Sequence, residues 1–301
     1  MLMRVRRLAR ESFHDFLEDR CTVMAAALSY YSLFAMPGLL LVAVYVAESM
    51  YGNHAAAGRV QTQFARLLGA KTGSAIKSMI AGATTGTRSG TAASVAAFGG
   101  LTFSALAAVY ELQIALNQAW DVEVEHVGSR RFILKRIMSL VVMAGAVVLL
   151  LCSLLAVPAV SVLTRGLSGT AKDLLYIAEI VIFWAILTAL LAVIMKVLPD
   201  AEIGWRDVWF GAAVTAALIL FGRVVMGTYL ASFGFNNAYG VAGSIAALLL
   251  WAYYSAAILL LGVEFTRVWA REHGRRIQPE EGAVRVAITQ RRILAPQDSR
   301  G

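Results

Sequence analysis

Two charged residues interrupt apolar stretches of this sequence, and they are the strongest candidates for chemistry. Arg223 lies within the apolar stretch 208–230, and Glu179 lies within the stretch 174–196. If these stretches cross a bilayer, each charge costs at least about 2.5–3.5 kcal/mol at the centre, so it pairs with an opposite charge or lines water. The two residues are therefore candidates for a polar path or an anionic headgroup site. The alternative is a structural ion pair that fixes the register of two helices.

Four polar residues at the ends of apolar stretches are further candidates for a substrate path. Glu48 follows the first stretch, and Glu111 and Glu264 end two others. The helix through Glu111 is expected to continue past Asn117, which adds an amide to the same end. Glu111 and Glu264 could instead snorkel to water or cap a neighbouring backbone. The sequence leaves both interpretations open.

Hydroxyl side chains and a proline mark the first and last apolar stretches. Tyr30 and Tyr31 form part of a polar ring in the first stretch, and Pro37 follows near its middle. A proline inside a helix leaves carbonyls unbonded and bends the helix. Broken helices often mark transport sites, although packing alone can also accommodate such a bend. Tyr253 and Tyr254 offer a similar polar patch on the last stretch.

Patterns typical of catalysis or metal binding are missing from the sequence. There is no phosphate-binding loop, no zinc signature of paired cysteines and no histidine pair at helical spacing. The four histidines lie in separate loops or tails, and Cys21 and Cys152 are not expected to form a disulfide. We therefore expect no enzyme activity, no bound metal and no cofactor.

The composition identifies the class of protein that positions these residues. Of the 301 residues, 59% are hydrophobic and only 15% are charged. An average soluble domain is about 45–50% apolar and about 25% charged. A globule of this size cannot bury so much apolar surface, because its own surface needs polar cover. The sequence therefore predicts a polytopic membrane protein.

The apolar stretches predict an all-α fold, a six-transmembrane-helix bundle with an N-terminal amphipathic helix. A helix crosses the hydrocarbon core in about 20 residues, whereas open strands would leave backbone groups unpaired in lipid. Together the spans form a transmembrane domain over residues 23–266. The six predicted spans are residues 23–47, 91–110, 137–163, 174–196, 208–230 and 241–264.

The segments outside the spans are more polar. Residues 1–22 are predicted to be a basic cytoplasmic segment, and residues 51–90 an extracytoplasmic loop. Residues 267–301 are predicted to be a basic, partly disordered cytoplasmic tail. The N-terminal segment is either an amphipathic helix or a simple basic flank. The helix is suggested by the spacing of Val5, Leu8, Ser12, Phe13, Phe16 and Leu17.

The distribution of basic residues predicts the orientation. With the N-terminus inside, 19 of the 27 Lys and Arg residues lie in cytoplasmic segments and 7 lie outside. This bias favours cytoplasmic placement of both termini in a bacterial inner membrane. Arg223 and Glu179 then fall at similar depth in the outer leaflet, with Glu48 as a third member of that layer.

Several separated motifs carry a family resemblance. The first span reads Ala-Ala-Ala-Leu-Ser-Tyr-Tyr-Ser-Leu-Phe-Ala-Met-Pro over residues 25–37. The last begins Tyr239-Gly240, continues Trp251-Ala-Tyr253-Tyr254 and closes Gly262-Val-Glu264. As a set, these motifs resemble the YihY/BrkB family of bacterial inner-membrane proteins over roughly residues 10–270. The resemblance implies about six spans and a link to envelope integrity and virulence, with no agreed substrate; some members have carried a ribonuclease label.

These observations favour a transporter or translocator of an envelope component, a lipid or another anionic amphiphile. The alternative is an envelope-integrity scaffold that transports nothing, and a membrane-bound ribonuclease is a disfavoured third hypothesis. Membrane lipids are the expected partners, and no specific nucleic acid is expected. Envelope proteins and further copies of the chain stay open as partners.

The predicted ion pair can be tested by charge reversal. Arg223→Glu should impair folding or membrane insertion, because it places two acidic groups at one depth in the membrane. Adding Glu179→Arg should partly restore the amount of folded protein, measured by size-exclusion chromatography of detergent extracts. A single variant that accumulates and folds normally would show that the two residues do not pair.

Overall fold

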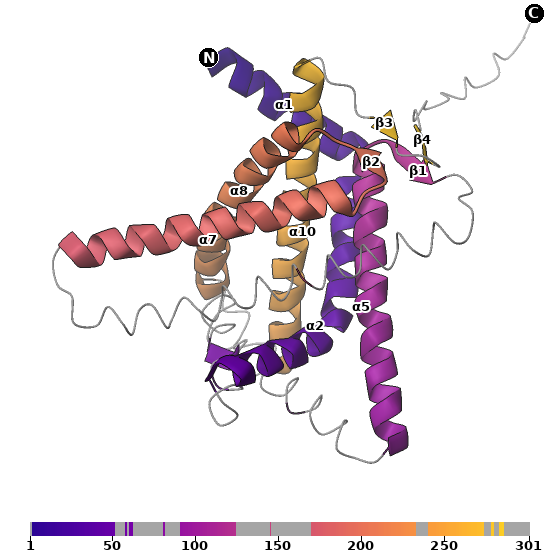
Figure 1. Cartoon of the computed structure of the whole chain (residues 1–301), viewed down its shortest axis with the longest axis vertical. Helices are drawn as coiled ribbons and strands as arrows, with labels where there is room; N and C mark the ends of the chain where they lie inside the picture. The colour runs from indigo at the N-terminus through magenta and orange to yellow at the C-terminus, as the bar shows by residue number, and fades with distance from the viewer. Residues whose placement is uncertain are drawn as a thin grey trace, which may run out of the picture.

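The structure is a computed structural model that describes residues 2–51, 91–124, 170–232 and 240–273 as continuous segments. It also describes residues 58, 60–62, 81, 145, 278–279 and 283–285. Apart from residue 145, the third predicted span lies outside the described residues, as does most of the 51–90 loop. The long helices are α1 (Leu2–Glu18), α2 (Cys21–Tyr51), α5 (Thr91–Ala119), α7 (Thr170–Val197), α8 (Trp205–Ser232) and α10 (Gly240–Glu272) (Figure 1).

Four of these helices are long and apolar enough to cross a membrane. They agree with the first, fourth, fifth and sixth predicted spans, and α5 contains the second, residues 91–110, within one helix. The all-α prediction is thus confirmed for the described residues apart from short strands, while the count of six spans stays a prediction. The candidate spans are Cys21–Glu48, Ile180–Val197, Trp205–Met226 and Ile245–Glu272.

Helix α2 changes direction along its length. Figure 1 shows its first part beside α5 and its far end turned away from that line. Pro37 lies inside this helix. Its ring lacks an amide hydrogen and clashes with the preceding turn, which bends a helix.

Helices α8 and α10 pack closely through two reciprocal glycine–threonine pairs. A Cβ atom on Gly211 would clash with Thr266, and one on Gly262 would clash with Thr215. Thr215 Oγ1 donates a hydrogen bond to Gly211 O, and Thr266 Oγ1 donates one to Gly262 O, each at 2.7 Å. Small residues let helix backbones approach in a membrane, and these hydroxyls are satisfied within their own helices. The pairs therefore fix how α8 and α10 meet.

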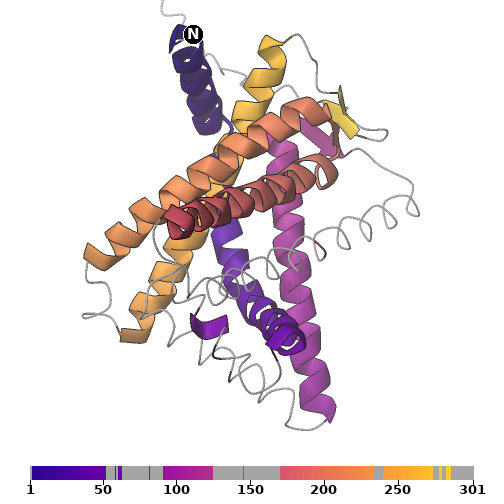
Figure 2. The same ribbon diagram turned by 60° about the vertical axis from the view of Figure 1, so that its left-hand side comes forward.

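Helix α7 crosses the direction of α5 and α10 at a wide angle in both views (Figures 1 and 2). It packs against α8, where Trp184 Nε1 donates to Ala213 O at 3.3 Å. A hydrophobic core joins α7 and α8 to the end of α5 and to α10. Its buried members include Leu116, Trp120, Leu191, Met195, Val208 and Val263.

The predicted N-terminal helix is present and packs against the end of α10 (Figures 1 and 2). Leu8 and Phe16 are buried on this side of the helix. The buried hydroxyl of Ser12 donates a hydrogen bond to Leu8 O at 2.8 Å, within the same helix. Phe13 and Leu17, on the adjoining side of the helix, are exposed. The helix is therefore amphipathic, and one of its faces is fixed by packing within the protein.

Two short antiparallel strand pairs connect the tail to the loops. β1 (Val122–Val124) pairs with β4 (Ala283–Arg285), and β2 (Ala201–Glu202) pairs with β3 (Gln278–Pro279). The tail, residues 267–301, is predicted to be basic and partly disordered, and its described residues 278–279 and 283–285 form these strands. Strands of two or three residues are too short to produce the alternating pattern by which strands are recognised.

A larger residue at Gly262 should separate α8 from α10. Gly262→Ala is expected to lower the free energy of unfolding by about 1–3 kcal/mol, the usual cost of overpacking. The measurement is the melting temperature in detergent, followed by size-exclusion chromatography. Adding Thr215→Gly should recover part of the loss, because it removes the side chain that the new methyl group meets.

Gly100→Ala in α5 is the matched control, since no atom lies within 4 Å of the Cβ atom it would gain. Alanine is favoured over glycine in a helix, so this variant should melt no lower than the unmodified protein. Equal losses in both variants would contradict the close packing of α8 and α10.

Candidate functional site

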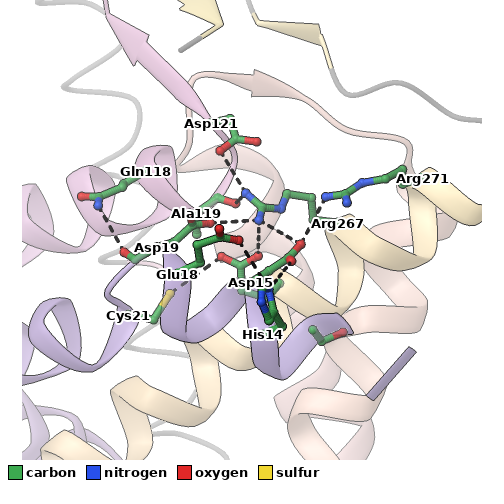
Figure 3. A network of polar contacts seen from close by, with 12 residues as sticks. His14, Asp15, Glu18, Asp19, Cys21, Gln118, Ala119, Asp121, Arg267 and Arg271 are labelled. Carbon is green, nitrogen blue, oxygen red and sulfur yellow. Dashed lines mark hydrogen bonds and ion pairs between the residues drawn. The ribbon is translucent and has the colours of Figure 1, made fainter. Parts of the chain in front are cut away.

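A buried arginine joins the ends of several helices. Arg267 lies near the end of α10, where the end of α1, the start of α2 and the end of α5 come together (Figure 3). Its side chain is only 8% exposed. This convergence makes the surroundings of Arg267 the most extensive polar site among the described residues.

The guanidinium of Arg267 contacts four carboxylates and one backbone carbonyl. Nη2 lies 3.2 Å from Asp15 Oδ2, 2.9 Å from Asp19 Oδ2 and 2.9 Å from Glu264 Oε2. Nη1 lies 3.0 Å from Asp121 Oδ1 and donates to Ala119 O at 3.1 Å. We call these five charged residues the Arg267 cluster. The planar fork of arginine suits such a set of acceptors, because its donors point in fixed directions.

Local backbone geometry brings the acidic groups to this point. Arg20, between α1 and α2, and Asp121, just after α5, both adopt left-handed conformations, with φ of 54° and 56°. Such residues commonly end helices, and aspartate tolerates this conformation better than most residues. The turn at Asp121 presents its carboxylate and the free carbonyl of Ala119 to the same guanidinium. A cation there also meets the negative end of the α5 dipole.

Glu264 is completely buried, with 0% exposure. Arg267 binds one carboxylate oxygen, and the thiol of Cys21 donates to Oε1 with Sγ at 3.7 Å. Of the interpretations that the sequence leaves open, this burial excludes the one in which Glu264 snorkels to water. The physical reason is that α10 continues to Glu272 and α1 packs over this part of it.

The Arg267 cluster contains more acidic than basic groups. Arg271, which is 61% exposed, adds a second cation by contacting Asp15 at 3.2 Å. Gln118 Nε2 also donates to the backbone carbonyl of Asp19 at 3.2 Å. Chemically, the arrangement is an ion-pair junction that holds α1 and the end of α5 against α10. It contains none of the residues that the sequence proposes for the outer leaflet.

A second polar network lies beside the first. Asn117 Nδ2 donates to Asp200 Oδ2 at 2.8 Å, and Asp200 N donates back to Asn117 Oδ1 at 2.8 Å. Gln113 Nε2 adds a bond to the same carboxylate at 3.1 Å. Asn117 therefore connects α5 to the turn between α7 and α8. Lys196 closes that turn by donating to Ile203 O at 2.6 Å.

Arg223 lies apart from both networks, exposed on α8. It lines a hollow between α8 and α10 with Gly222, Trp251, Tyr254 and Ser255. No described carboxylate lies within ion-pair distance of Arg223, and the side chain of Glu179 is outside the described side chains. The Arg223–Glu179 pair therefore stays a prediction.

The tyrosine candidates occupy separate surroundings. Tyr254 packs its hydroxyl against Gly222 of α8, whereas Tyr253 packs towards α2. Tyr30 is exposed and contacts Phe34 edge to face, with ring centroids 4.9 Å apart. Tyr31 is half-buried, as are Glu48 and Glu111. The structure thus groups only Tyr254 with Arg223.

One group of described side chains could hold a metal ion. His14 Nδ1 lies 3.4 Å from Glu18 Oε2 and 3.9 Å from Asp15 Oδ1. His14 and Glu18 are largely exposed, and Asp15 already contacts Arg267 and Arg271. Ion pairing explains this group without a metal.

The sequence analysis named one residue of each network, Glu264 and Asn117, and missed the others. Asp15, Asp19, Asp121, Asp200 and Arg267 were not candidates. One signal was available: Glu264 and Arg267 lie three residues apart, on one face of a helix. The partners on α1 and α5 have no such signal, because their proximity arises only in the folded protein.

The long apolar helices, joined at their ends by buried ion pairs, define a multi-pass α-helical membrane protein. The chain belongs to the BrkB family, since the family described as "Virulence factor BrkB" matches residues 12–286. The match extends from α1 to beyond β4. It confirms the resemblance that the motifs of the first and last spans indicate.

Similar proteins are bacterial membrane proteins. A UPF0761 membrane protein of Pseudomonas aeruginosa PAO1 is 27% identical over 299 residues, which cover 95% of this chain and 69% of the relative. One of Stenotrophomonas maltophilia K279a is 28% identical over 291 residues, which cover 89% of this chain and 61% of the relative. The chain thus spans about two thirds of the length of these relatives. No solved structure matches it.

Removing the buried cation should be much more damaging than removing its exposed neighbour. Arg267→Met is expected to lower the free energy of unfolding by about 3–5 kcal/mol, because it leaves buried carboxylates without a counter-charge. Arg271→Met removes the same charge from an exposed side chain and should cost at most about 1 kcal/mol. Melting temperatures of the two proteins in one detergent measure the difference, and similar values would contradict a structural role for the Arg267 cluster.

Proposed function

We propose that this protein moves an anionic amphiphile, a lipid or a related envelope component, across the bacterial inner membrane and so supports envelope integrity. The observation that carries the proposal is the exposed Arg223 within a candidate membrane span. An arginine with no described carboxylate within ion-pair distance is costly in hydrocarbon, so a ligand that supplies a negative charge would stabilise it.

The surroundings of Arg223 suit an amphiphile. Its guanidinium can bind a phosphate or carboxylate with two parallel hydrogen bonds. Ser255 Oγ, in the same hollow, is buried and has no hydrogen-bond partner among the described residues. Met226 and Trp251 add apolar surface for an acyl chain. The surface at Arg223 therefore offers a charged group beside an apolar wall, with the Ser255 hydroxyl buried beneath it.

The proposed orientation follows from the bias of basic residues. With both termini in the cytoplasm, Arg223 lies in the outer half of the membrane and the Arg267 cluster lies at the inner face. The description of the BrkB family as a virulence factor is consistent with a role at the cell envelope. In this proposal the protein is not an enzyme, and its partners are membrane lipids.

The test is lipid movement in vesicles that contain the purified full chain. A fluorescent phosphatidylglycerol is placed in both leaflets, and dithionite bleaches whatever reaches the outer one. The protein should increase the bleached fraction above that of empty vesicles. Arg223→Ala should slow the movement about tenfold or more, the loss expected for one charge-assisted hydrogen bond, and Arg223→Lys should retain part of it.

Arg206→Ala is the matched control, because Arg206 is exposed at the start of the same helix but outside the hollow. It should leave lipid movement unchanged. No movement of any tested lipid by well-folded protein would overturn the proposal.

That negative result would favour the alternative, an envelope-integrity scaffold that transports nothing. A specific observation supports this alternative: the buried charges of the Arg267 cluster pair with one another at the ends of the helices. A membrane-bound ribonuclease stays a third, disfavoured proposal. Cleavage of RNA by highly purified protein, abolished by a substitution at Glu111 or Glu264, would support it.

A further inference from the structure

Helix α1 has a buried stripe and an exposed stripe of side chains, and the two adjoin where Phe16 and Phe13 stack with ring centroids 6.3 Å apart. The buried stripe, with Leu8, Ser12 and Phe16, faces α10. The other stripe consists of Arg6, Arg10, Phe13 and Leu17, all exposed. Their spacing of four, three and four residues places them on one side of a helix with 3.6 residues per turn. We call this set the α1 stripe.

Ion pairs fix the direction in which the α1 stripe faces. Asp15 and Asp19 are bound by Arg267, and Arg271 binds Asp15 as well. Near the other end of the helix, Arg7 lies 4.0 Å from Glu272 of α10. Rotation of α1 about its axis would break these contacts. The α1 stripe is therefore held away from α10.

The position of α1 along the chain brings the α1 stripe to a membrane surface. α1 ends at Glu18, and the candidate span of α2 begins at Cys21. Phe13 (55% exposed) and Leu17 (53% exposed) lie in the half of α1 nearest that span. Arg10 lies about 10 Å further along the helix axis than Leu17. This order, apolar before basic, matches the change from hydrocarbon to headgroups at a bilayer surface.

The charge of the α1 stripe is entirely positive. Of the acidic residues on its flank, Glu11 pairs with Arg7 at 2.7 Å, and Glu18 lies 3.4 Å from His14, which carries a charge only when it is protonated. Basic side chains beside exposed aromatic and aliphatic ones are typical of helices that bind anionic lipid surfaces. Guanidinium groups also bind phosphates with two hydrogen bonds.

We propose that the α1 stripe binds the headgroups of anionic lipids at the membrane surface, with Phe13 and Leu17 inserted beside them. This interaction is separate from the hollow at Arg223 and does not depend on lipid transport. A non-transporting protein would bind lipid here equally well. The occupant is the bilayer itself, in the leaflet next to the start of α2.

The test uses the full chain in vesicles, with a bimane label on Phe13→Cys. Cys152 is replaced by serine, and Cys21 is kept because it is buried. Quenching of the label is compared in two vesicle preparations that contain phosphatidylglycerol and phosphatidylcholine. In one the phosphatidylglycerol is brominated, in the other the phosphatidylcholine is, and the mole fraction of brominated lipid is the same in both. The brominated anionic lipid should quench about twofold more strongly, because basic residues enrich it locally. Arg6→Gln with Arg10→Gln should bring the two values together.

Glu18→Cys carries the label in the control protein, since Glu18 is also exposed but lies off the α1 stripe. Its label should be quenched less than the label on Phe13→Cys. Equal quenching at both positions, or equal quenching by both lipids at Phe13→Cys, would overturn the proposal. Absent quenching would also overturn it, and disulfide formation between copies of the unlabelled Phe13→Cys protein would then assign the α1 stripe to a contact between copies. An unchanged melting temperature of the variant with Arg6→Gln and Arg10→Gln would show that these substitutions alter lipid binding without altering the fold.

Discussion

The arrangement of the helix ends depends on the need to neutralise one buried guanidinium. Arginine does not lose its proton inside a protein, so Arg267 must be surrounded by acceptors wherever it is buried. Those acceptors come from α1, from the turn after α5 and from α10 itself. Because removing any segment would leave an unpaired charge, the segments hold one another in place. The left-handed turns at Arg20 and Asp121 contribute to the same constraint, since they turn the chain so that its acidic side chains lie beside Arg267.

Polar contacts determine how the helices pack, because apolar contacts in a membrane hardly distinguish one packing arrangement from another. Lipid tails are as apolar as leucine, so a helix segment that is apolar on every side, such as residues 180–195 of α7, gains little stability from one rotation about its axis over another. Contacts with a fixed geometry favour one rotation of each helix over the others. The Asp200–Asn117 pair sets the turn between α7 and α8 against α5, and the glycine–threonine pairs set α8 against α10. A small number of polar and small residues thereby specifies the packing of long apolar helices.

The same physics explains which features were predictable from the sequence. Long uncharged stretches reveal spans because a bilayer imposes a length and a composition, and the spacing of Leu8 and Phe16 revealed α1. A buried ion near the end of a span cannot be told from an exposed one in this way, because either one ends the uncharged stretch. Arg267 was therefore assigned to the tail, although α10 continues to Glu272. Asp15 and Asp121 are far from Arg267 in the sequence, and only the fold brings them to it.

The close packing of α8 and α10 constrains how a lipid could use the hollow at Arg223. Gly211, Gly262 and Gly222 all meet side chains of the opposite helix, so the two helices are in contact along much of their length. Opening a path between them would break these contacts and expose Thr215 and Thr266. In the proposed transport a headgroup would instead travel along the outer surface of the pair, bound by the exposed Arg223, while its acyl chains stay in the bilayer. In that mechanism the Arg267 cluster keeps α10 fixed, and the lipid moves past a rigid surface.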